Sequence, residues 1–232
     1  MVKIIKSEDM FVNRRQTILS MGDSRTGKTA FLGTICDHEK VLILNAEDGL
    51  STIEGKKFDA IRVTTFKEFK EALNWYLTEG HKDYTMLAVD SINRVQSFLA
   101  FELDKDGKLT QNQWGEVLAT LRKVLEVLQT KCPTGYFMSS MAMESKDELT
   151  GRIRIYPNLG GAFKYDLTGY FDTVLYHHAK ADTKGETQYY CQLQGDTRVV
   201  AGSRLTGLKG IKNIPCDYGI MIGILNKETV NG

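Results

Sequence analysis

Short, continuous apolar runs alternate along this chain with segments whose apolar residues recur at helical spacing. These runs predict strands at residues 16–20, 40–48, 60–65, 84–90 and 135–143, the first of them short and buried. The periodic segments predict helices, at residues 28–36, 66–80 and 112–130. Strands that alternate with helices in this way are typical of βαβ units. We therefore predict an α/β fold with a mostly parallel central sheet and helices on both faces.

The pattern changes after residue 170, where two strand-like stretches flank the polar turn "ADTKGE". Such a pair predicts an antiparallel hairpin that extends the C-terminal part of the sheet. The chain has three prolines and shows no internal repeat or low-complexity tract. We therefore expect one main domain at residues 16–220, an N-terminal segment at 1–15 and a C-terminal tail at 221–232.

Composition and charge exclude some classes of protein. The 232 residues are 42% hydrophobic and 25% charged, which suits one compact domain with a sizeable core. The formal net charge of +1 argues against wholesale electrostatic capture of nucleic acid or membrane, so any nucleic-acid contact must come from a local patch. No run approaches the ~18 apolar residues of a membrane span, and the N-terminus lacks the apolar core of a signal peptide. These features predict a cytoplasmic protein with no membrane partner.

The four cysteines lie far apart and form no C-x-x-C pair: Cys36, Cys132, Cys191 and Cys216. This spacing predicts reduced, mostly buried thiols rather than a disulfide framework or a zinc site. His177 and His178 fall on a predicted strand, where adjacent side chains point to opposite faces. They are therefore not expected to form a metal-binding pair.

The stretch "GDSRTGKT" at residues 22–29 fits the pattern G-x-x-x-x-G-K-[ST]. Its glycines let the backbone curl so that successive N–H groups point at phosphate oxygens, and the following helix adds its positive N-terminal end. Lys28 is expected to reach the β- and γ-phosphates, and the Thr29 hydroxyl to ligate Mg²⁺. The alternative is a glycine-rich turn with an exposed lysine, but a strand precedes the motif and a helix follows it, as nucleotide binding requires. The residues expected to hold ATP are Gly22, Asp23, Ser24, Arg25, Thr26, Gly27, Lys28, Thr29 and Ala30.

A metal-binding acid is expected at the end of a strand neighbouring this phosphate loop. The run "YTMLAVD" ends in Asp90, which we expect to hold Mg²⁺ through water, although an aspartate there also suits a cap for the helix that begins at Ser91. Because Ser91 is not a glutamate, the group that orients the attacking water must come from elsewhere. Glu47 ends the strand "VLILNAED", with Asp48 as its competitor, and ligands bind at the carboxyl ends of parallel strands. The alternative is that both acids only begin a solvated loop.

Together these residues resemble the RecA-like P-loop ATPases. "VLILNAEDG" and "LAVDSI" are similar to that family's strand ending in a catalytic glutamate and its metal-binding strand ending Asp-Ser. Later segments resemble the short phage-encoded branch, which comprises RecA-like nucleotide-binding proteins associated with recombination and single-strand annealing: "QWGEVL", "YPNLGG", "YFDTVLY" and "RVVAGSR". The resemblance covers roughly residues 14 to 220.

The resemblance implies a RecA-like ATPase domain that uses ATP and Mg²⁺ and acts on single-stranded DNA in phage-type homologous recombination or strand annealing. It implies catalytic roles for Lys28 and Glu47, and ATP sites at the subunit boundaries of a homo-oligomer. A single-strand-binding protein is a further implied partner, and the host cytoplasm is the implied location if the chain is phage-encoded.

The chain departs from the family at two positions. Met141 stands where relatives often carry a polar residue that senses the γ-phosphate, and a thioether is a poor hydrogen-bond partner for phosphate. Gly202 stands where relatives tend to carry a lysine, while Arg204 is kept and is implied to reach the nucleotide of a neighbouring subunit. Both departures weigh against fast hydrolysis. They favour, as one alternative, a nucleotide-gated oligomeric scaffold with little hydrolysis. A P-loop nucleotide kinase is a second alternative, because it would share the phosphate loop; Arg152 and Arg154 are its only candidate lid pair, and the acids around them make a weak lid.

The resemblance also indicates where nucleic acid would bind, because RecA-like proteins use loops after their central strands. The matching stretch is 144–161, in which the candidate contacts are Lys146, Arg152, Arg154 and Tyr156. Three acids in the same stretch oppose this interpretation: Glu144, Asp147 and Glu148. The alternation in "RIRIY" also fits a plain, half-exposed hairpin.

Overall fold

A computed structural model describes residues 15–104, 107–146 and 151–229. Apart from Arg15, the expected N-terminal segment lies outside these residues, as do Asp147 and Glu148. Most of the segment expected as a C-terminal tail belongs to a helix, α7 (Tyr218–Thr229). None of the helices in the described residues is long and apolar enough to cross a membrane.

Ten strands of the described residues form one sheet, in the order β10-β8-β7-β1-β5-β4-β2-β3, with β6 paired to β5 and β9 paired to β7. Their bounds are β1 (Thr17–Gly22), β2 (Val41–Asn45), β3 (Asp59–Arg62), β4 (Met86–Asp90), β5 (Gly135–Lys146), β6 (Ile153–Pro157), β7 (Thr173–Ala181), β8 (Thr187–Gln192), β9 (Gly202–Ser203) and β10 (Asn213–Pro215). The six strands from β7 to β3 run parallel, whereas β7, β8 and β10 pair antiparallel. The mostly parallel sheet and its C-terminal antiparallel hairpin are therefore confirmed.

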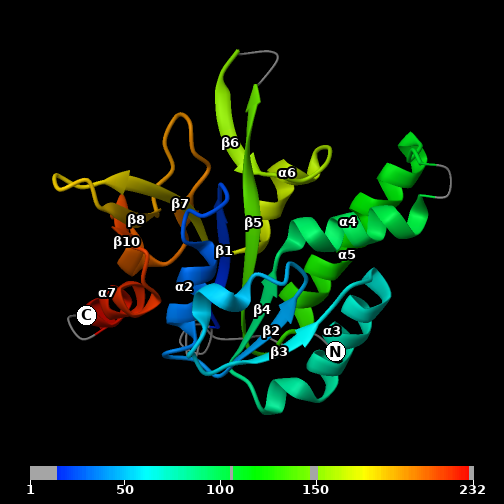
Figure 1. Ribbon diagram of the computed structural model, residues 1–232, viewed down its shortest axis with the longest axis horizontal. Coiled ribbons are helices and arrows are strands. Elements are labelled where there is room, and N and C mark those ends of the chain that lie inside the picture. The colour runs from blue at the N-terminus through cyan, green and yellow to red at the C-terminus, as the bar shows by residue number, and fades with distance from the viewer. Residues whose placement is uncertain (1–14, 105–106, 147–150, 230–232) are drawn as a thin grey trace, which may run out of the picture.

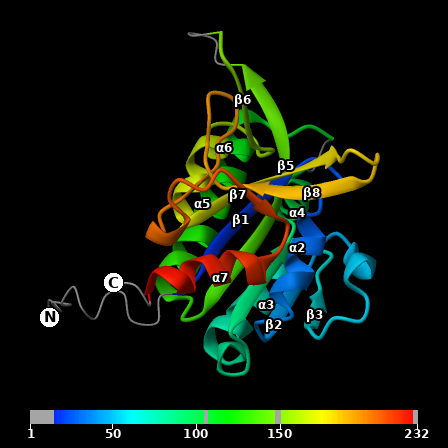
Figure 2. The ribbon, with the colours of Figure 1, turned by 90° about the vertical axis from the view of Figure 1, so that its left-hand side faces the viewer.

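Helices cover both faces of this sheet, as predicted (Figures 1 and 2). Besides α7, they are α2 (Lys28–Ile35), α3 (Phe66–Thr78), α4 (Ile92–Leu103), α5 (Gln111–Lys131) and the short α6 (Phe163–Asp166). One apolar layer joins the sheet to α3, α4 and α5, and the other joins it to α2 and α7. Because α2 lies in the second layer, the phosphate loop that precedes it is fixed to the sheet at both of its ends.

The continuous apolar runs follow from this double covering. In β2, Leu42 and Leu44 pack in the layer of α3, α4 and α5, whereas Val41 and Ile43 pack in the layer of α2 and α7. Alternate residues of a strand point to opposite faces, so a strand buried on both sides must be apolar throughout. Each such side chain contributes about 1.5–3 kcal/mol relative to an exposed one. The sheet is thus a rigid platform for the loops at its edge.

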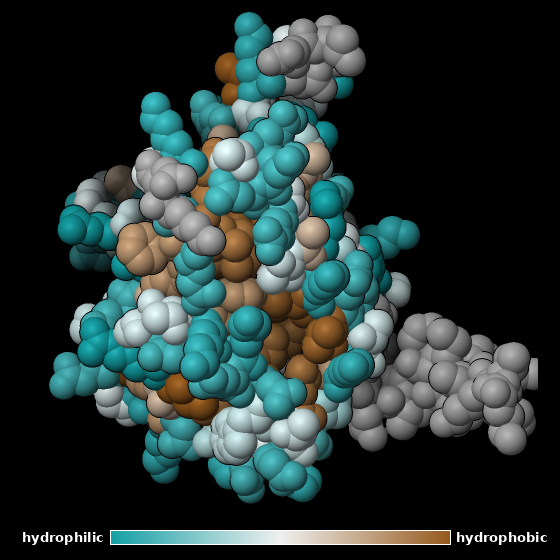
Figure 3. All heavy atoms as spheres, turned by 90° about the vertical axis from the view of Figure 1, so that its right-hand side faces the viewer, coloured by the Kyte–Doolittle hydropathy of each residue, from teal (hydrophilic) through white to brown (hydrophobic). Residues whose placement is uncertain are grey.

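The surface has two further features, a projecting hairpin and an area of exposed apolar side chains. Beyond the body of the sheet, β5 continues and pairs with β6 as a projecting hairpin (Figure 1). On the side of α3, α4 and α5, apolar side chains reach the surface among polar ones (Figure 3). Phe101 of α4 is the most exposed of the large hydrophobic residues described, at 83%.

Candidate functional site

The phosphate loop connects β1 to α2 and has the tight backbone that the motif requires. A Cβ on Gly22 would lie 2.8 Å from the carbonyl oxygen of His177 and 2.6 Å from the hydroxyl of Thr26, so the loop passes too close to β7 for a larger residue. Gly27 caps α2 with a φ of 96°, in the left-handed region that favours glycine. The loop therefore curls back over the end of β1 and begins a helix, which is the arrangement that binds anions.

Lys28 is held inside this loop. Its Nζ donates to the carbonyl oxygens of Gly22 (2.9 Å) and Asp23 (2.6 Å) and lies 3.7 Å from the sulfur of Met141. Burial lowers the pKa of Lys28, while the nearby carboxylates of Glu47 and Asp90 act in the opposite direction. The ammonium group is thus positioned by the backbone that would also surround a phosphate.

Asp90 ends β4 and is buried, with 4% of its surface exposed. The Ser139 hydroxyl donates to its carboxylate, and burial raises the pKa of Asp90 above its usual value. One expectation was wrong: β4 is not the neighbour of β1, because β5 lies between them. Ser139 belongs to that intervening strand, so β5 itself positions the acid at the edge of the site.

Glu47 lies beside Asp90 because β2 and β4 are parallel neighbours whose ends coincide at Asn45 and Asp90. The backbone N–H of Glu47 donates to the Asp90 carbonyl oxygen at 3.2 Å, and the Ser91 hydroxyl donates to the Glu47 carboxylate. The next residue, Asp48, is turned away: its carboxylate pairs with Arg62 at 2.6 Å and its side chain is 62% exposed. The geometry therefore favours Glu47 over Asp48 as the group that faces the site.

A cavity of about 450 Å³ opens between the phosphate loop and the ends of the central strands. This is within the range of about 300–1,000 Å³ that is usual for small-molecule sites. Its lining comes from the loop, from the segment after β2 and from β4, β5 and β8: Ser24, Arg25, Gly27, Lys28, Thr29, Ala30, Glu47, Gly49, Thr52, Asp90, Met141 and Tyr189. Among the predicted nucleotide-binding residues, Gly22, Asp23 and Thr26 shape the loop without lining the cavity.

The residues around this cavity fit a nucleotide with Mg²⁺. The hydrogen bonds of the Lys28 Nζ go to two carbonyl oxygens of the loop, and the carboxylates of Glu47 and Asp90 lie near enough to affect its pKa. The Thr29 hydroxyl and the Asp90 carboxylate supply the hard oxygen ligands that Mg²⁺ prefers. Thr29, Lys28, Asp90 and Glu47 are thus brought to one cavity, as the sequence predicts.

Two residues that line this cavity, Met141 and Tyr189, lie outside the phosphate-loop motif. Met141 is paired in register with Gly22 and reaches Lys28, so the thioether does stand at the phosphate end of the site. Tyr189 comes from β8, and its ring lies 3.4 Å from the position of a Cβ on Gly27. No motif in the sequence points to Tyr189, because only the return of the C-terminal hairpin brings it to the loop.

Arg204 lies away from this cavity. Its backbone N–H donates to the Asp172 carbonyl oxygen at 2.7 Å, and its guanidinium donates to the Gly169 carbonyl oxygen at 3.0 Å. These residues precede β7, whose start is level with Ile18 of β1, whereas the phosphate loop follows the other end of β1. Arg204 therefore lies at the opposite edge of the sheet from the nucleotide cavity of its own chain.

The four candidate nucleic-acid contacts fall on or next to the β5–β6 hairpin, but not all on one face. Arg154 pairs in register with Ser145, and Tyr156 pairs with Met143, so these side chains share a face. Lys146 pairs with Ile153 and therefore points to the opposite face. The plain-hairpin interpretation of "RIRIY" is correct as a description of the backbone, and the hairpin sorts the basic residues between its two sides.

The face with Arg154 and Tyr156 gains two residues from α6. The Tyr165 ring meets the Tyr156 ring edge-on at 4.9 Å and is 49% exposed, and Lys164 donates to the Ser145 hydroxyl at 2.9 Å. The Arg154 guanidinium lies 5.9 Å from the Tyr156 ring, and its Nε is buried without a hydrogen-bond partner. We call these four residues, Arg154, Tyr156, Lys164 and Tyr165, the hairpin face.

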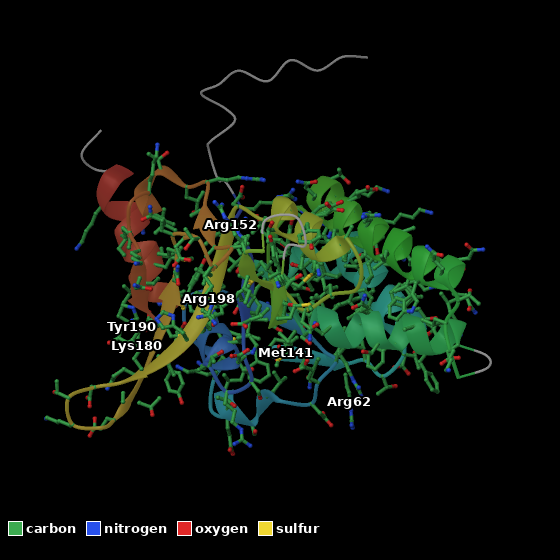
Figure 4. All side chains as sticks on the ribbon, turned by 90° about the horizontal axis from the view of Figure 1, so that it is seen from above. Arg62, Met141, Arg152, Lys180, Tyr190 and Arg198 are labelled. Carbon is green, nitrogen blue, oxygen red and sulfur yellow. The ribbon has the colours of Figure 1, made fainter. Side chains whose placement is uncertain are left out.

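Figure 4 looks onto the edge of the sheet that carries the site. Met141 lies near the middle of this edge, Arg62 lies on the side of β3, and Lys180 and Tyr190 lie toward the hairpin of β7 and β8. Arg198 lies between Met141 and that hairpin and pairs with Glu144. Along this edge, Arg62 and Arg198 thus lie to either side of Met141.

Comparison with known proteins identifies the family of this chain. A family model described as AAA domain (AAA_24) matches residues 14–205. Among solved structures, the flagellar accessory protein FlaH from Methanocaldococcus jannaschii is similar over 76% of each chain, with 10% identity and a TM-score of 0.42. The ATPase DotB from Legionella pneumophila is similar over 79% of this chain and 46% of its own, with 9% identity and a TM-score of 0.37. No curated protein matches the sequence.

Proposed function

This chain belongs to the AAA domain family, and we propose that it is an ATPase that binds ATP with Mg²⁺ and acts on single-stranded DNA in phage-type homologous recombination or strand annealing. The family supports nucleotide binding on a P-loop ATPase fold. The finer statement, that single-stranded DNA is the substrate and recombination or annealing the process, rests on the resemblance of the sequence and on the hairpin face.

The observation that carries the ATPase proposal is the convergence of a cation and two acids on one cavity. Lys28 would contact the β- and γ-phosphates, and Thr29 and Asp90 would hold the metal ion. When bound, Mg²⁺ neutralises charge that develops on the transferred phosphoryl group. Glu47 would accept a proton from the attacking water and orient it, since its carboxylate faces the cavity and is anchored by the Ser91 hydroxyl.

The hairpin face supports binding of single-stranded nucleic acid. Proteins that bind single strands combine cations that follow the phosphates with aromatic rings on which bases stack. Tyr165 and Tyr156 supply rings, and Arg154 and Lys164 supply cations beside them. The near-neutral net charge fits a local patch of this kind rather than a uniformly basic surface.

We expect Arg154→Ala and Tyr156→Ala each to weaken binding of a single-stranded oligonucleotide by about five- to hundredfold, which corresponds to the ~1–3 kcal/mol of one stacked base or its cationic partner. Fluorescence anisotropy with a labelled oligonucleotide measures the affinity. Lys146→Ala is the matched control, because it removes a positive charge from the other face of the same hairpin. Equal losses in all three variants would contradict a binding face at Arg154 and Tyr156.

Self-association is the second part of the proposal. Arg204 is far from its own cavity but is exposed at the opposite edge of the sheet, where it is available to a neighbouring subunit. The exposed Phe101 and the apolar surface on its side of the molecule support a contact between chains (Figure 3). In such an assembly each ATP site would lie at a subunit boundary.

We expect Arg204→Ala to bind ATP normally but to hydrolyse it about tenfold more slowly, the effect of losing about 1.4 kcal/mol of contact with the phosphates. Mixing Arg204→Ala with Glu47→Gln should restore activity above the sum of the two separate rates, because one subunit offers an intact arginine to the other's intact glutamate. Lys209→Ala, a neighbouring exposed cation, is the control. An additive mixture, with a rate per chain that does not depend on protein concentration, would argue against a shared site.

Met141 favours one alternative, a nucleotide-gated scaffold with little hydrolysis. Its sulfur occupies the side of Lys28 where relatives of the RecA-like class carry a polar residue. Phosphate release, measured with and without single-stranded DNA, separates the two functions. A rate that stays near zero while ATP alters particle size would favour the scaffold, and phosphoryl transfer to a nucleoside monophosphate would favour a kinase.

A further inference from the structure

A cluster of one imidazole and two thiols lies behind the phosphate loop. His177 on β7 and Cys191 on β8 are directly paired in register, and both are fully buried. Cys216 follows β10, and its backbone N–H donates to the carbonyl oxygen of Tyr189. The β7–β8 hairpin and the end of β10 thus bring three potential metal ligands, one histidine and two cysteines, to one face of the sheet.

The ligand atoms of this cluster face one another. The Nδ1 of His177 lies 3.2 Å from the sulfur of Cys216 and 3.6 Å from the sulfur of Cys191, and all three ligand atoms lie within 4.8 Å. The other ring nitrogen, Nε2, lies 2.7 Å from the hydroxyl of Ser20. With Nε2–H donating to Ser20, Nδ1 is the ring nitrogen left to bind a metal ion, and the Cys216 sulfur is the closer of the two sulfurs to it.

We propose that His177, Cys191 and Cys216 form a metal site for Zn²⁺. Tetrahedral zinc with bonds of about 2.3 Å to sulfur and 2.0 Å to nitrogen places a sulfur and a nitrogen ligand about 3.5 Å apart, close to the spacing in this cluster. Imidazole with thiolates is a ligand set that zinc takes up readily. Ser20 completes the arrangement, since a metal-bound histidine usually gives its second N–H to a nearby oxygen.

The register of the strands argues against a disulfide as the purpose of this cluster. Cys191 pairs with Ile214, so Cys216, which directly follows β10, is its diagonal neighbour. Diagonal neighbours in an antiparallel pair have Cα atoms about 7–8 Å apart, beyond the usual span of a disulfide. An ion between the sulfurs bridges this separation without moving the backbone.

The position of the cluster suggests what the ion would do. The Cys216 thiol donates to the Gly27 carbonyl oxygen at 3.3 Å, so the same sulfur contacts the phosphate loop. A metal ion there would tie β10 and β8 to β7 and would hold the loop from behind. With three protein ligands, a fourth coordination position remains for water. This role does not depend on the DNA substrate proposed above.

The test is the zinc content of the full-length protein after loading with Zn²⁺ and dialysis. We expect about one zinc per chain in the wild type, and at least a roughly tenfold loss of zinc affinity in Cys191→Ala and in Cys216→Ala. Cys36→Ala is the matched control, because Cys36 is also a buried free thiol but lies outside the cluster. Circular dichroism confirms that each variant is folded.

A second measurement does not rely on variants. Wild-type protein loaded with Co²⁺ in place of zinc should show the intense visible absorption of tetrahedral cobalt and a sulfur-to-cobalt charge-transfer band. Absence of zinc and of these bands in the wild type would overturn the proposal. Retention of zinc by a folded Cys191→Ala or Cys216→Ala variant would overturn it as well, as would an intact mass showing that Cys191 and Cys216 are joined by a disulfide.

Discussion

Replacing Glu47 with glutamine is expected to slow ATP hydrolysis by about a hundredfold or more while ATP still binds. Glutamine keeps the shape of the side chain and can still accept from the Ser91 hydroxyl, but it cannot take a proton from water. The carboxylate faces the cavity beside Asp90, so the loss should fall on turnover and not on affinity. Phosphate release at saturating ATP measures the rate, and calorimetry measures the affinity.

Asp48→Asn is the control for this experiment, because it removes the adjacent carboxylate. Asp48 is paired with Arg62 at the surface and does not line the cavity, so its variant should hydrolyse ATP at nearly the normal rate. A large loss in Asp48→Asn with none in Glu47→Gln would transfer the role to Asp48. Loss of ATP binding in Glu47→Gln would instead show that the residue acts in binding.

Lys28→Ala is expected to weaken the binding of ATP with Mg²⁺ by about ten- to hundredfold, since a charge-assisted hydrogen bond contributes ~1.5–3 kcal/mol. The fold should persist, because the ammonium group contacts only loop carbonyls and the Met141 sulfur rather than the apolar core. Calorimetry measures the affinity, and circular dichroism measures folding.

Lys56→Ala is a suitable comparison for this variant. Lys56 forms a surface ion pair with Asp37 and does not line the nucleotide cavity, so its loss should leave ATP affinity unchanged. A folded Lys28→Ala protein with the affinity of the wild type would remove the basis for assigning residues 22–29 to phosphate binding.

Much of the fold was predictable because the information is local. The β2 run is apolar from Val41 to Leu44 since both faces of the sheet are covered, and α3 and α5 keep a helical apolar period. The spatial order of the strands was not predictable in the same way. Asp90 was expected on a neighbour of β1, yet β5, which comes later in the chain, lies between them. No local pattern encodes which strand enters that position.

Some parts of the candidate site were likewise predictable from local sequence, and other parts were not. The phosphate loop was predictable because one continuous motif makes it, and Glu47 meets Asp90 because parallel strands end at the same edge. Tyr189 and Cys216 reach the loop only through the pairing of β8 with β7 and β10. The separation of Lys146 from Arg154 depends on hairpin register, where a shift of one residue would exchange the two faces.

The length of β5 has a mechanical consequence. The strand pairs with β1 as far as Met141 and with β6 from Ala142 onward, so it is clamped on one side of this point and projects on the other. From Met141 to Lys146 the projection is about 17 Å at ~3.3 Å per residue, so a tilt of about 10° at its base moves the tip by about 3 Å. That is close to the length of a hydrogen bond. The strand is therefore a cantilever with its base at the thioether beside Lys28, and its outer part is braced where Arg198 contacts Glu144 and Lys164 contacts Ser145.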